Sequence, residues 1–435
     1  MKRIFQSIGP AIIVAAVVLG PGSILTSSKV GATFGLMGIP VVVAAAILMI
    51  AMVALSARLG VVYENSLCEE LASRVGRPVT VLIGMILFIL VALFQSSNNL
   101  AVIGGIEPML GDHQLGLVGK YFILGVVNAL VICIFYFMRG LYSSIENVMK
   151  LLIGLMSAAF LINFVLVMSR SQSFEPVVVT QSSDLIPLLG MIGTTFSVAG
   201  AFYQAYLVKE KGWGLKDAKN GMIDSVVSIS ILGTITLVVL LTAWRVFYGN
   251  PAHVELASIG DVARQLEPTF GTTAKFVFCG GILAGAFSSF LINALIGGTV
   301  MSDAIGKGAR LSDPWPIRFT TLALVVGGFV AAASINDSES TVHLIMVAQA
   351  LTVLGIPALA LALIYLGTRP ELKGERRVPK AILVIAIIGL FVSCGLAYLT
   401  ASKVIKKFRA EPRDLQAFNQ AGVDSHPGPK ACAPN

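Results

Sequence analysis

The four residues Gly20-Pro21-Gly22-Ser23 interrupt an apolar segment that covers residues 6–34. Glycine weakens a helix, and proline removes a backbone N–H donor and disrupts the preceding turn. In the hydrocarbon core of a bilayer, an unpaired backbone polar group is so costly that a helix is broken only where protein or a water-lined cavity satisfies it. The stretch therefore predicts a broken membrane-spanning helix with a solute-binding site at the break.

The composition of the whole chain is that of a polytopic membrane protein. Of its 435 residues, 56% are hydrophobic and 12% are charged, and the mean hydropathy is +0.86. A soluble protein carries about 25% charged residues, and a bilayer-spanning helix needs about 20 predominantly apolar residues. Apolar runs near that length recur along the chain and predict an all-α fold. The first segment lacks the small-residue cleavage site of a secretion signal, so it is interpreted as a retained helix.

Several classes of function lack the residues that they would need. The five cysteines share no CxxC spacing and are interpreted as packing residues. The four histidines are scattered, and the sequence has no phosphate-binding Gly-Lys-Ser/Thr loop, so neither a metal cofactor nor ATP is expected. No nucleophile–base pair supports an intramembrane enzyme. We therefore expect a transport process without cofactors that is gradient-driven or passive.

The hydrophobic pattern predicts eleven membrane spans. They cover residues 6–34, 39–62, 79–106, 120–138, 148–168, 185–208, 222–247, 272–303, 317–334, 341–366 and 381–402. The sixth span contains Gly193 and the pair Ala199-Gly200, so it is a candidate for a second break although it has no proline. Residues 1–402 are thus expected to form one transmembrane domain, and the polar residues 403–435 a disordered tail.

The charges of the loops predict the orientation of the spans. Basic residues fall in every second loop, at Arg74, Arg77, Arg139, Lys209, Lys211, Lys216, Lys219, Lys307, Arg310, Arg369, Lys373, Arg376 and Arg377. By the positive-inside bias, these loops and the N-terminus are cytoplasmic, in the inner (cell) membrane. Eleven spans then place the C-terminus outside, although the basic residues at 403–409 oppose this. The same bias explains the net charge of +8 without a nucleic-acid partner.

The order of the spans predicts an internal repeat. The first and sixth spans are expected to open two five-helix halves of opposite orientation, residues 5–168 and 185–366, with an extra helix at 381–402. Secondary transporters built from inverted repeats bind their substrate between the broken helices of the two halves. The expected partners are the lipid bilayer and a small-molecule or ion substrate, and a monomer is expected.

Polar residues inside the spans are further candidates for function. Lys29 lies nine residues beyond Gly20 and either faces the solute path or extends to the membrane surface. Asp224 opens the seventh span, where a carboxylate either stabilises a helix N-terminus or takes part in transport. Most neutral side chains suit hydrogen bonds between helices or packing. The hydrogen-bonding set includes Gln95, Ser96, Ser97, Asn98, Asn99, Thr194, Thr195, Ser197, Gln204 and Gln349, and the packing set is Ser288, Ser289 and Asn293 of the eighth span.

Several blocks of sequence carry a family resemblance. They are Ile8-Gly9-Pro10 with Gly20-Pro21-Gly22-Ser23 and Gly31-Ala32-Thr33-Phe34-Gly35, Ala57-Arg58-Leu59-Gly60-Val61-Val62, Leu283-Ala284-Gly285-Ala286-Phe287-Ser288-Ser289, and Gln349 with Leu366-Gly367-Thr368-Arg369. In order and spacing, the chain resembles the NRAMP family of proton-coupled divalent metal transporters over residues 5–402. The resemblance implies a LeuT-type fold of two inverted five-helix repeats plus an eleventh helix.

The metal-binding motifs implied by this resemblance are mostly replaced. The family's first-helix Asp-Pro-Gly-Asn, whose Asp and Asn bind the metal, is Gly20-Pro21-Gly22-Ser23 here. The sixth-helix Met-Pro-His falls on Ser197-Val198-Ala199, and a later His falls on Gln204. A third-helix Asp associated with proton movement aligns with Asn98, whereas the tenth-helix glutamine is kept as Gln349.

These replacements change the charge of the expected site. A dehydrated divalent cation in a low-dielectric site needs compensating negative charge, and soft sulfur ligands select transition metals. The replacement of the Asp and Met ligands argues against Mn or Fe uptake by the family's usual site. The N–H groups at the starts of two half-helices instead attract an anion. We therefore expect a secondary active transporter, a symporter working by alternating access, that takes up a small carboxylate-bearing organic solute. The alternatives are a divalent cation transporter of the Mg or Mn type and a non-transporting sensor.

The expected site follows from the same positions. The substrate-binding residues are expected to be Gly20, Gly22, Ser23, Thr194, Ser197 and Gln349. The residues expected along the pathway, or in coupling to a proton or sodium ion, are Lys29, Asn98, Gln204 and Asp224.

Overall fold

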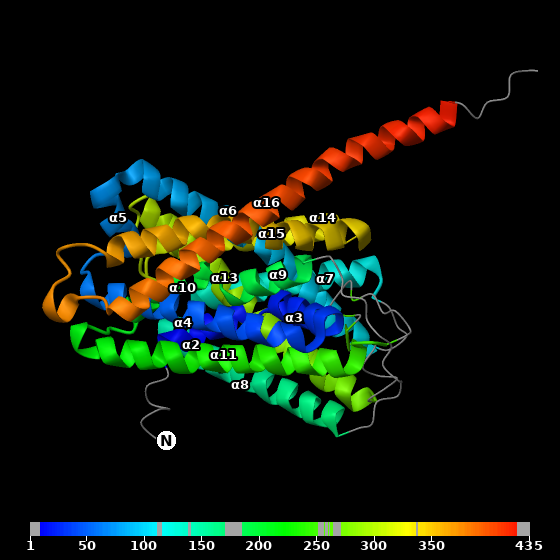
Figure 1. Cartoon of the computed structure of the whole chain (residues 1–435), viewed down its shortest axis with the longest axis horizontal. Coiled ribbons are helices and arrows are strands. Elements are labelled where there is room, and N and C mark those ends of the chain that lie inside the picture. The colour runs from blue at the N-terminus through cyan, green and yellow to red at the C-terminus, as the bar shows by residue number, and fades with distance from the viewer. Residues whose placement is uncertain are drawn as a thin grey trace, which may run out of the picture.

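The computed structural model describes residues 9–110, 115–137, 141–169, 185–250, 256, 260, 262–263, 271–335 and 338–423, without the side chains of residues 141, 186, 338–352 and 403–423. Across these residues the regular elements are helices, most of which run side by side in one bundle (Figure 1). The predicted all-α class is confirmed.

The first span is broken where its sequence predicts. α2 (Pro10–Val18) is followed by α3 (Pro21–Phe34), and Gly20 between them has an extended backbone with φ −73° and ψ 177°. Each half begins with proline, which suits the first helical position because its missing N–H would have no partner there. Gly35 ends α3 with φ 58°, a left-handed conformation that glycine adopts without strain.

Five helices complete the first half of the chain. They are α4 (Gly38–Val62), α5 (Leu67–Val75), α6 (Arg77–Ile106), α7 (Leu117–Phe137) and α8 (Leu141–Met168). The short helix α5 was not predicted. Its signal is present in the sequence, because Ser66 and Glu69 have the spacing of a capping box, and the Ser66 hydroxyl accepts a hydrogen bond from the Glu69 N–H.

The second half repeats the arrangement with its own broken span. It consists of α9 (Ile186–Thr195), α10 (Val198–Glu210), α11 (Ala218–Phe247), α13 (Thr272–Ala304), α14 (Pro314–Ser334) and α15 (Ser338–Gly367). The second break, at Phe196 and Ser197, confirms that the sixth span is discontinuous.

The last helix differs from the expectation. α16 (Lys380–Val423) covers the predicted extra span and then continues as a helix, where a disordered tail was expected from residue 403. Residues 403–423 include Lys, Arg, Glu, Gln, Ala and Leu, which have high helix propensity, and the helix continues through Pro412. In Figure 1 this part of α16 projects from the bundle. Residues 424–435 lie outside the described residues.

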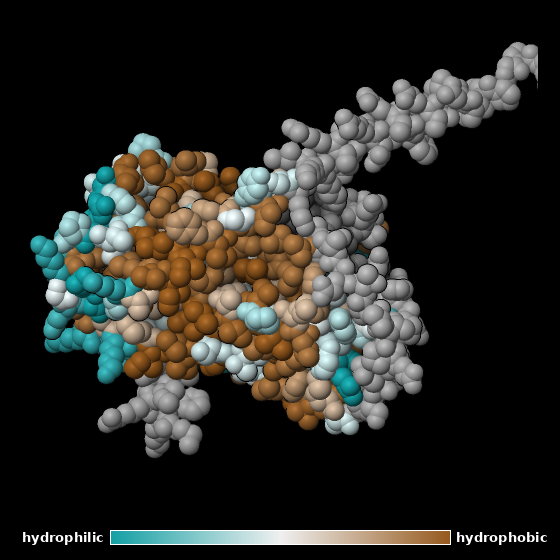
Figure 2. Space-filling model, in the orientation of Figure 1, coloured by the Kyte–Doolittle hydropathy of each residue, from teal (hydrophilic) through white to brown (hydrophobic). Residues whose placement is uncertain are grey.

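The described helices account for the eleven predicted spans. Within the described ranges, eight segments are long and apolar enough to cross a membrane, and one of these, Pro21–Val62, contains both α3 and α4. The remaining two predicted spans are the sixth, formed by the short helices α9 and α10, and the tenth, formed by α15. On the face seen in Figure 2, the middle of the bundle is apolar, and hydrophilic residues gather at the end where Figure 1 places α5. The chain is therefore a multi-pass membrane protein.

Helix α13 lies at the centre of this arrangement. Most of its residues are buried, whereas α7 exposes most of its surface. Gly298 of α13 packs directly on α14, since a Cβ there would lie 2.1 Å from the Thr320 hydroxyl. Close packing of small residues is the usual way in which membrane helices associate. α13 thereby becomes the fixed element against which both broken spans are placed.

Candidate functional site

The first break is packed against α13. Ser288 and Ser289 each donate a 2.8 Å hydrogen bond from the hydroxyl, to the carbonyls of Ala16 and Val17 in the last turn of α2. The last carbonyls of a helix have no partner within it, so the two hydroxyls replace the missing N–H donors. The carbonyl of Gly20 accepts from the N–H of Ser23 at 3.0 Å and from the N–H of Ile24 at 3.2 Å, in the first turn of α3.

The sequence assigned these serines only to packing. Their contact with the break could not be read from the chain, because each hydroxyl and the carbonyl it binds are 272 residues apart. The spacing of Gly285, Ser288 and Ser289 is nevertheless that of one helical face. Gly285 belongs to the same contact, since a Cβ there would lie 2.9 Å from the carbonyl of Leu19.

The second break is made without glycine or proline. At Phe196 and Ser197, ψ rises to 63° and 89°, which ends α9, and the Ser197 carbonyl accepts from the Ala201 N–H at 3.1 Å to begin α10. Within the described part of the chain, no side chain caps the first turn of α3 or of α10. The positive end of each helix dipole is therefore not neutralised by a side chain at its break.

The half-helices α3 and α9 touch each other just beyond the breaks. The hydroxyls of Thr26 and Thr194 are 3.1 Å apart. Thr26 also donates to the carbonyl of Gly22 at 2.9 Å, and Ser23 is buried with 3% of its surface exposed. Thr26 thus contacts both Gly22 and Thr194, which are two of the predicted substrate-binding residues.

The Asp224 carboxylate binds the N-terminus of α2 rather than that of its own helix. It accepts 2.8 Å hydrogen bonds from the N–H groups of Gly9 and Ala11, and a 3.1 Å bond from the Ser228 hydroxyl. It therefore caps the N-terminus of α2 from α11, rather than the start of its own helix. Of the two interpretations of Asp224, the helix-terminus one agrees with these contacts, with α2 as the helix concerned.

Two of the polar residues of α6, Gln95 and Asn99, connect it to other helices. Gln95 donates to the carbonyl of Phe290 on α13 at 2.7 Å, and Asn98 donates to the side-chain oxygen of Gln95 at 2.7 Å. Asn128 of α7 donates to the side chain of Asn99 at 2.7 Å. The bonds to Phe290 and from Asn128 agree with the interpretation as interhelical hydrogen bonding, whereas the Asn98 bond stays within α6. The side-chain oxygen of Asn98 has no partner among the described residues.

Gln204, Lys29 and Gln349 complete the predicted set. Gln204 is fully buried on α10, and neither atom of its amide has a hydrogen-bond partner in the described part of the chain. An unsatisfied buried polar group costs about 1–3 kcal/mol, so a water or substrate would stabilise it. Lys29 is partly buried on α3. Gln349 lies in α15, and its side chain is outside the described residues.

The breaks carry no acidic side chain. Gly20, Ser23, Thr194 and Ser197 are all neutral. Over the residues that the structure describes, no group of three or more His, Cys, Asp or Glu is placed to hold a metal ion. The ligands available at the breaks are hydroxyl and backbone carbonyl oxygens, which suit hard cations that keep part of their hydration shell.

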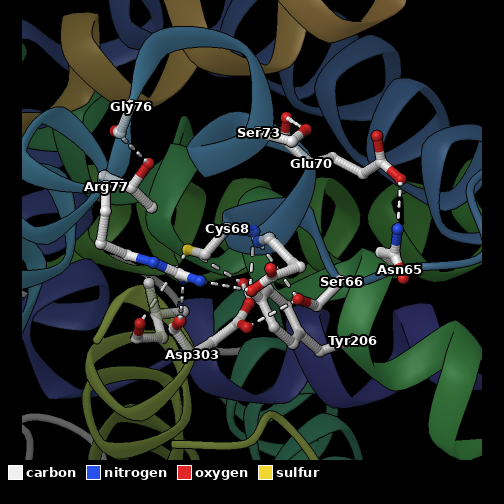
Figure 3. A network of polar contacts seen from close by, with 12 residues as sticks. Asn65, Ser66, Cys68, Glu70, Ser73, Gly76, Arg77, Tyr206 and Asp303 are labelled. Carbon is white, nitrogen blue, oxygen red and sulfur yellow. Dashed lines mark hydrogen bonds and ion pairs between the residues drawn. The ribbon is translucent and has the colours of Figure 1, made fainter. Parts of the chain in front are cut away.

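Asp303 organises the end of the bundle next to α5. Its carboxylate accepts from the Ser66 hydroxyl at 2.6 Å, the Tyr206 hydroxyl at 2.7 Å and the Cys68 N–H at 3.2 Å (Figure 3). Ser66 is the N-cap residue of α5, and Tyr206 lies on α10. One carboxylate thus joins α5, α10 and α13. Sequence reasoning missed it because Asp303 is a single acid at the end of a span.

The two breaks, the bundle and the apolar surface define a secondary transporter of LeuT-type fold. The profile of the family described as "Natural resistance-associated macrophage protein-like" (Nramp) matches residues 11–402. The chain belongs to the Nramp family, and the resemblance seen in the sequence is confirmed.

The relatives agree with this assignment. The chain is 25% identical over 399 residues to the "Divalent metal cation transporter MntH" of Acidiphilium cryptum, covering 89% of this chain and 88% of the relative. It is 24% identical over 413 residues to the protein of the same name in Verminephrobacter eiseniae, covering 92% and 89%. These relatives are transporters rather than enzymes, as expected from the sequence.

Solved structures confirm the fold. A manganese transporter of Eremococcus coleocola superposes with a TM-score of 0.78 at 16% identity, over 97% of this chain and 92% of that chain. The nucleobase-cation-symport-1 family transporter Mhp1 superposes with a TM-score of 0.56 at 10% identity, over 91% and 93%.

Proposed function

We propose that the protein is a cell-membrane transporter that moves a hydrated divalent metal cation by alternating access. The observation that carries the proposal is the Nramp match over residues 11–402, with both helix breaks present in the structure. The named function of the MntH relatives, divalent metal cation transport, favours a cation over the organic solute expected from the sequence.

The chemistry of the breaks favours a cation that keeps water. Ser23, Thr194 and Ser197 offer neutral oxygens, which cannot offset the cost of stripping a divalent ion. Mg²⁺ dehydrates reluctantly and is usually bound with several of its waters, so it suits such a site better than Mn²⁺ or Fe²⁺ held by softer ligands.

Alternating access follows from the way the halves are held. α2 and α10 are bonded to α13 through Ser288, Ser289 and Tyr206, whereas α3 and α9 are bonded to each other at Thr26 and Thr194. Movement of α2 or α10 away from α13 would break the bonds of Ser288, Ser289 or Tyr206. Separation of α3 from α9 would instead break the contact between Thr26 and Thr194. By the positive-inside bias, the end with α5 and most of the basic loops is cytoplasmic.

A carboxylate-bearing organic solute is the second candidate. The uncapped N-termini of α3 and α10 and the absence of an acid among Gly20, Ser23, Thr194 and Ser197 favour it. In this alternative the two helix N-termini bind the carboxylate, and a proton or sodium gradient drives uptake.

Purified protein in liposomes distinguishes these candidates. We expect saturable Mg²⁺ flux, weaker Mn²⁺ flux and no competition by amino acids or dicarboxylates, measured with imposed pH and sodium gradients in turn. Saturable uptake of a labelled carboxylate without any cation flux would replace the cation proposal by the second candidate. Absence of both fluxes would overturn both and favour the sensor. Empty liposomes and liposomes with the Ser23→Val variant are the controls.

A further inference from the structure

We infer that Ser289 keeps the substrate site neutral, because it occupies the space that any side chain at residue 20 would need. The inference deepens the proposed function, since it concerns which cation the same site accepts. It makes Ser289 a specificity-determining residue, whereas a serine in α13 would otherwise count as helix packing.

The geometry at Gly20 leaves no room for a side chain. A Cβ there would lie 2.3 Å from the Ser289 hydroxyl oxygen, 2.9 Å from the Ser289 Cβ and 3.2 Å from the carbonyl oxygen of Val17. Non-bonded carbon atoms reach their best separation only at about 3.5–4.0 Å. The φ of Gly20 is −73°, so the backbone itself would accept other residues. The two shortest distances are both to Ser289, so the restriction comes mainly from Ser289, and the Val17 carbonyl adds a smaller one.

Ser289 cannot easily turn away. It is fully buried, and its hydroxyl donates to the Val17 carbonyl at 2.8 Å and accepts from the Asn293 amide at 3.1 Å. A change of rotamer would break both bonds and would still leave the Cβ contact of 2.9 Å. The side chain is thus fixed from both sides.

Ser288 provides a matched control within the same helix. It is also fully buried, and its hydroxyl oxygen lies 2.8 Å from the Ala16 carbonyl and 2.9 Å from the Gly285 carbonyl, which share its one donor proton. It is not among the atoms nearest to a Cβ on Gly20. The two serines therefore share burial and helix capping, and only Ser289 excludes a side chain at the break.

The consequence is a coupling between the two positions. A carboxylate at residue 20 would add the negative charge that a dehydrated divalent cation requires. Ser289 prevents that carboxylate from being accommodated, so the site stays neutral and favours a hydrated ion.

The test uses full-length protein with Gly20→Asp, Ser289→Gly, Ser288→Gly and the two double variants. We expect Gly20→Asp to lower the thermal midpoint in detergent. Adding Ser289→Gly should restore it and raise Mn²⁺ affinity over Mg²⁺ affinity by about tenfold or more, measured by calorimetry. Adding Ser288→Gly to Gly20→Asp should neither restore the thermal midpoint nor raise Mn²⁺ affinity over Mg²⁺ affinity.

Equal rescue by both serine variants would overturn the inference, and so would Gly20→Asp alone being as stable as the parent. A double variant that is stable without any gain in Mn²⁺ selectivity would overturn it as well. Failure of the proposed function is separable, because the parent protein would then carry no cation while the pattern of thermal midpoints would still test the coupling.

Discussion

The hydroxyl of Tyr206 donates a 2.7 Å hydrogen bond to the carboxylate of Asp303, which joins the half-helix α10 to α13. The same carboxylate accepts from Ser66 and from the N–H of Cys68, so it also holds the start of α5. A carboxylate that accepts three hydrogen bonds in a buried position is costly to replace.

Asp303→Asn is expected to lower the free energy of unfolding by about 2 kcal/mol, because an amide offers one acceptor oxygen where the carboxylate offers two. Thermal unfolding in detergent, with a chemical-denaturant series, measures the change. Asp313→Asn is the control, since among the described residues the Asp313 side chain accepts from the Arg310 N–H of its own loop alone, at 3.1 Å. Equal losses in the two variants would show that the Asp303 network does not stabilise this end.

Tyr206→Phe is expected to cost about 1 kcal/mol, since it removes one hydroxyl and keeps the ring. In combination with Asp303→Asn, the loss should be smaller than the sum of the single losses, because Asp303→Asn weakens the same bond that Tyr206→Phe removes. The double-mutant cycle measures this coupling directly. Additive losses would mean that the hydroxyl and the carboxylate act independently. Tyr203→Phe, one turn away on α10, serves as the comparison.

Asp224→Ala is expected to destabilise the protein by about 1–2 kcal/mol, as for the loss of a helix N-cap. Asp224→Asn should cost less, because its oxygen can still accept from Gly9 or Ala11. The pH dependence of transport in liposomes should be the same for Asp224→Asn as for the parent. Loss of that pH dependence with an unchanged thermal midpoint would instead make Asp224 a coupling residue.

Cys68 is expected to react slowly with water-soluble thiol reagents. Burial raises the pKa of its thiol well above the ordinary value, and the neighbouring Asp303 carboxylate raises the pKa further. The thiolate is the reactive form, so the raised pKa keeps Cys68 unreactive through neutral pH. The labelling rate should rise about tenfold per pH unit from pH 7 to 9 without levelling off.

The labelling control is Glu64→Cys, an exposed position, with the native cysteines replaced. Its rate should level off near an ordinary thiol pKa of about 8.5. Asp303→Asn should accelerate labelling of Cys68, because it removes a nearby negative charge and loosens α5. Equal rates for Cys68 and the control at pH 7 would contradict the burial seen here.

Much of the fold could be predicted because its signals are local. Gly20 and Pro21 mark the first break, and apolar runs of sufficient length mark the unbroken spans. The second break was harder, since Phe196 and Ser197 are not helix breakers; the glycines that suggested it, Gly193 and Gly200, lie within the flanking helices. Tertiary packing, rather than local propensity, ends the helix there.

The candidate site was predicted less completely. Loss of the acidic residue at position 20 was visible in the sequence, but its structural partner Ser289 was not, because the two meet only in the folded chain. Asp303 was overlooked for the same reason. The preference for an organic solute rested on charge alone, and the family relationship favours a cation that keeps its water instead.

Helix α13 is bonded to α2 by Ser288 and Ser289 and to α10 by Asp303. The positions of one half-helix from each broken span can therefore be measured relative to the same helix. A spin label fixed on α13 would therefore report the displacement of either half-helix as a change in distance. Paired measurements from that label would show whether the two half-helices swing together or in turn during a transport cycle.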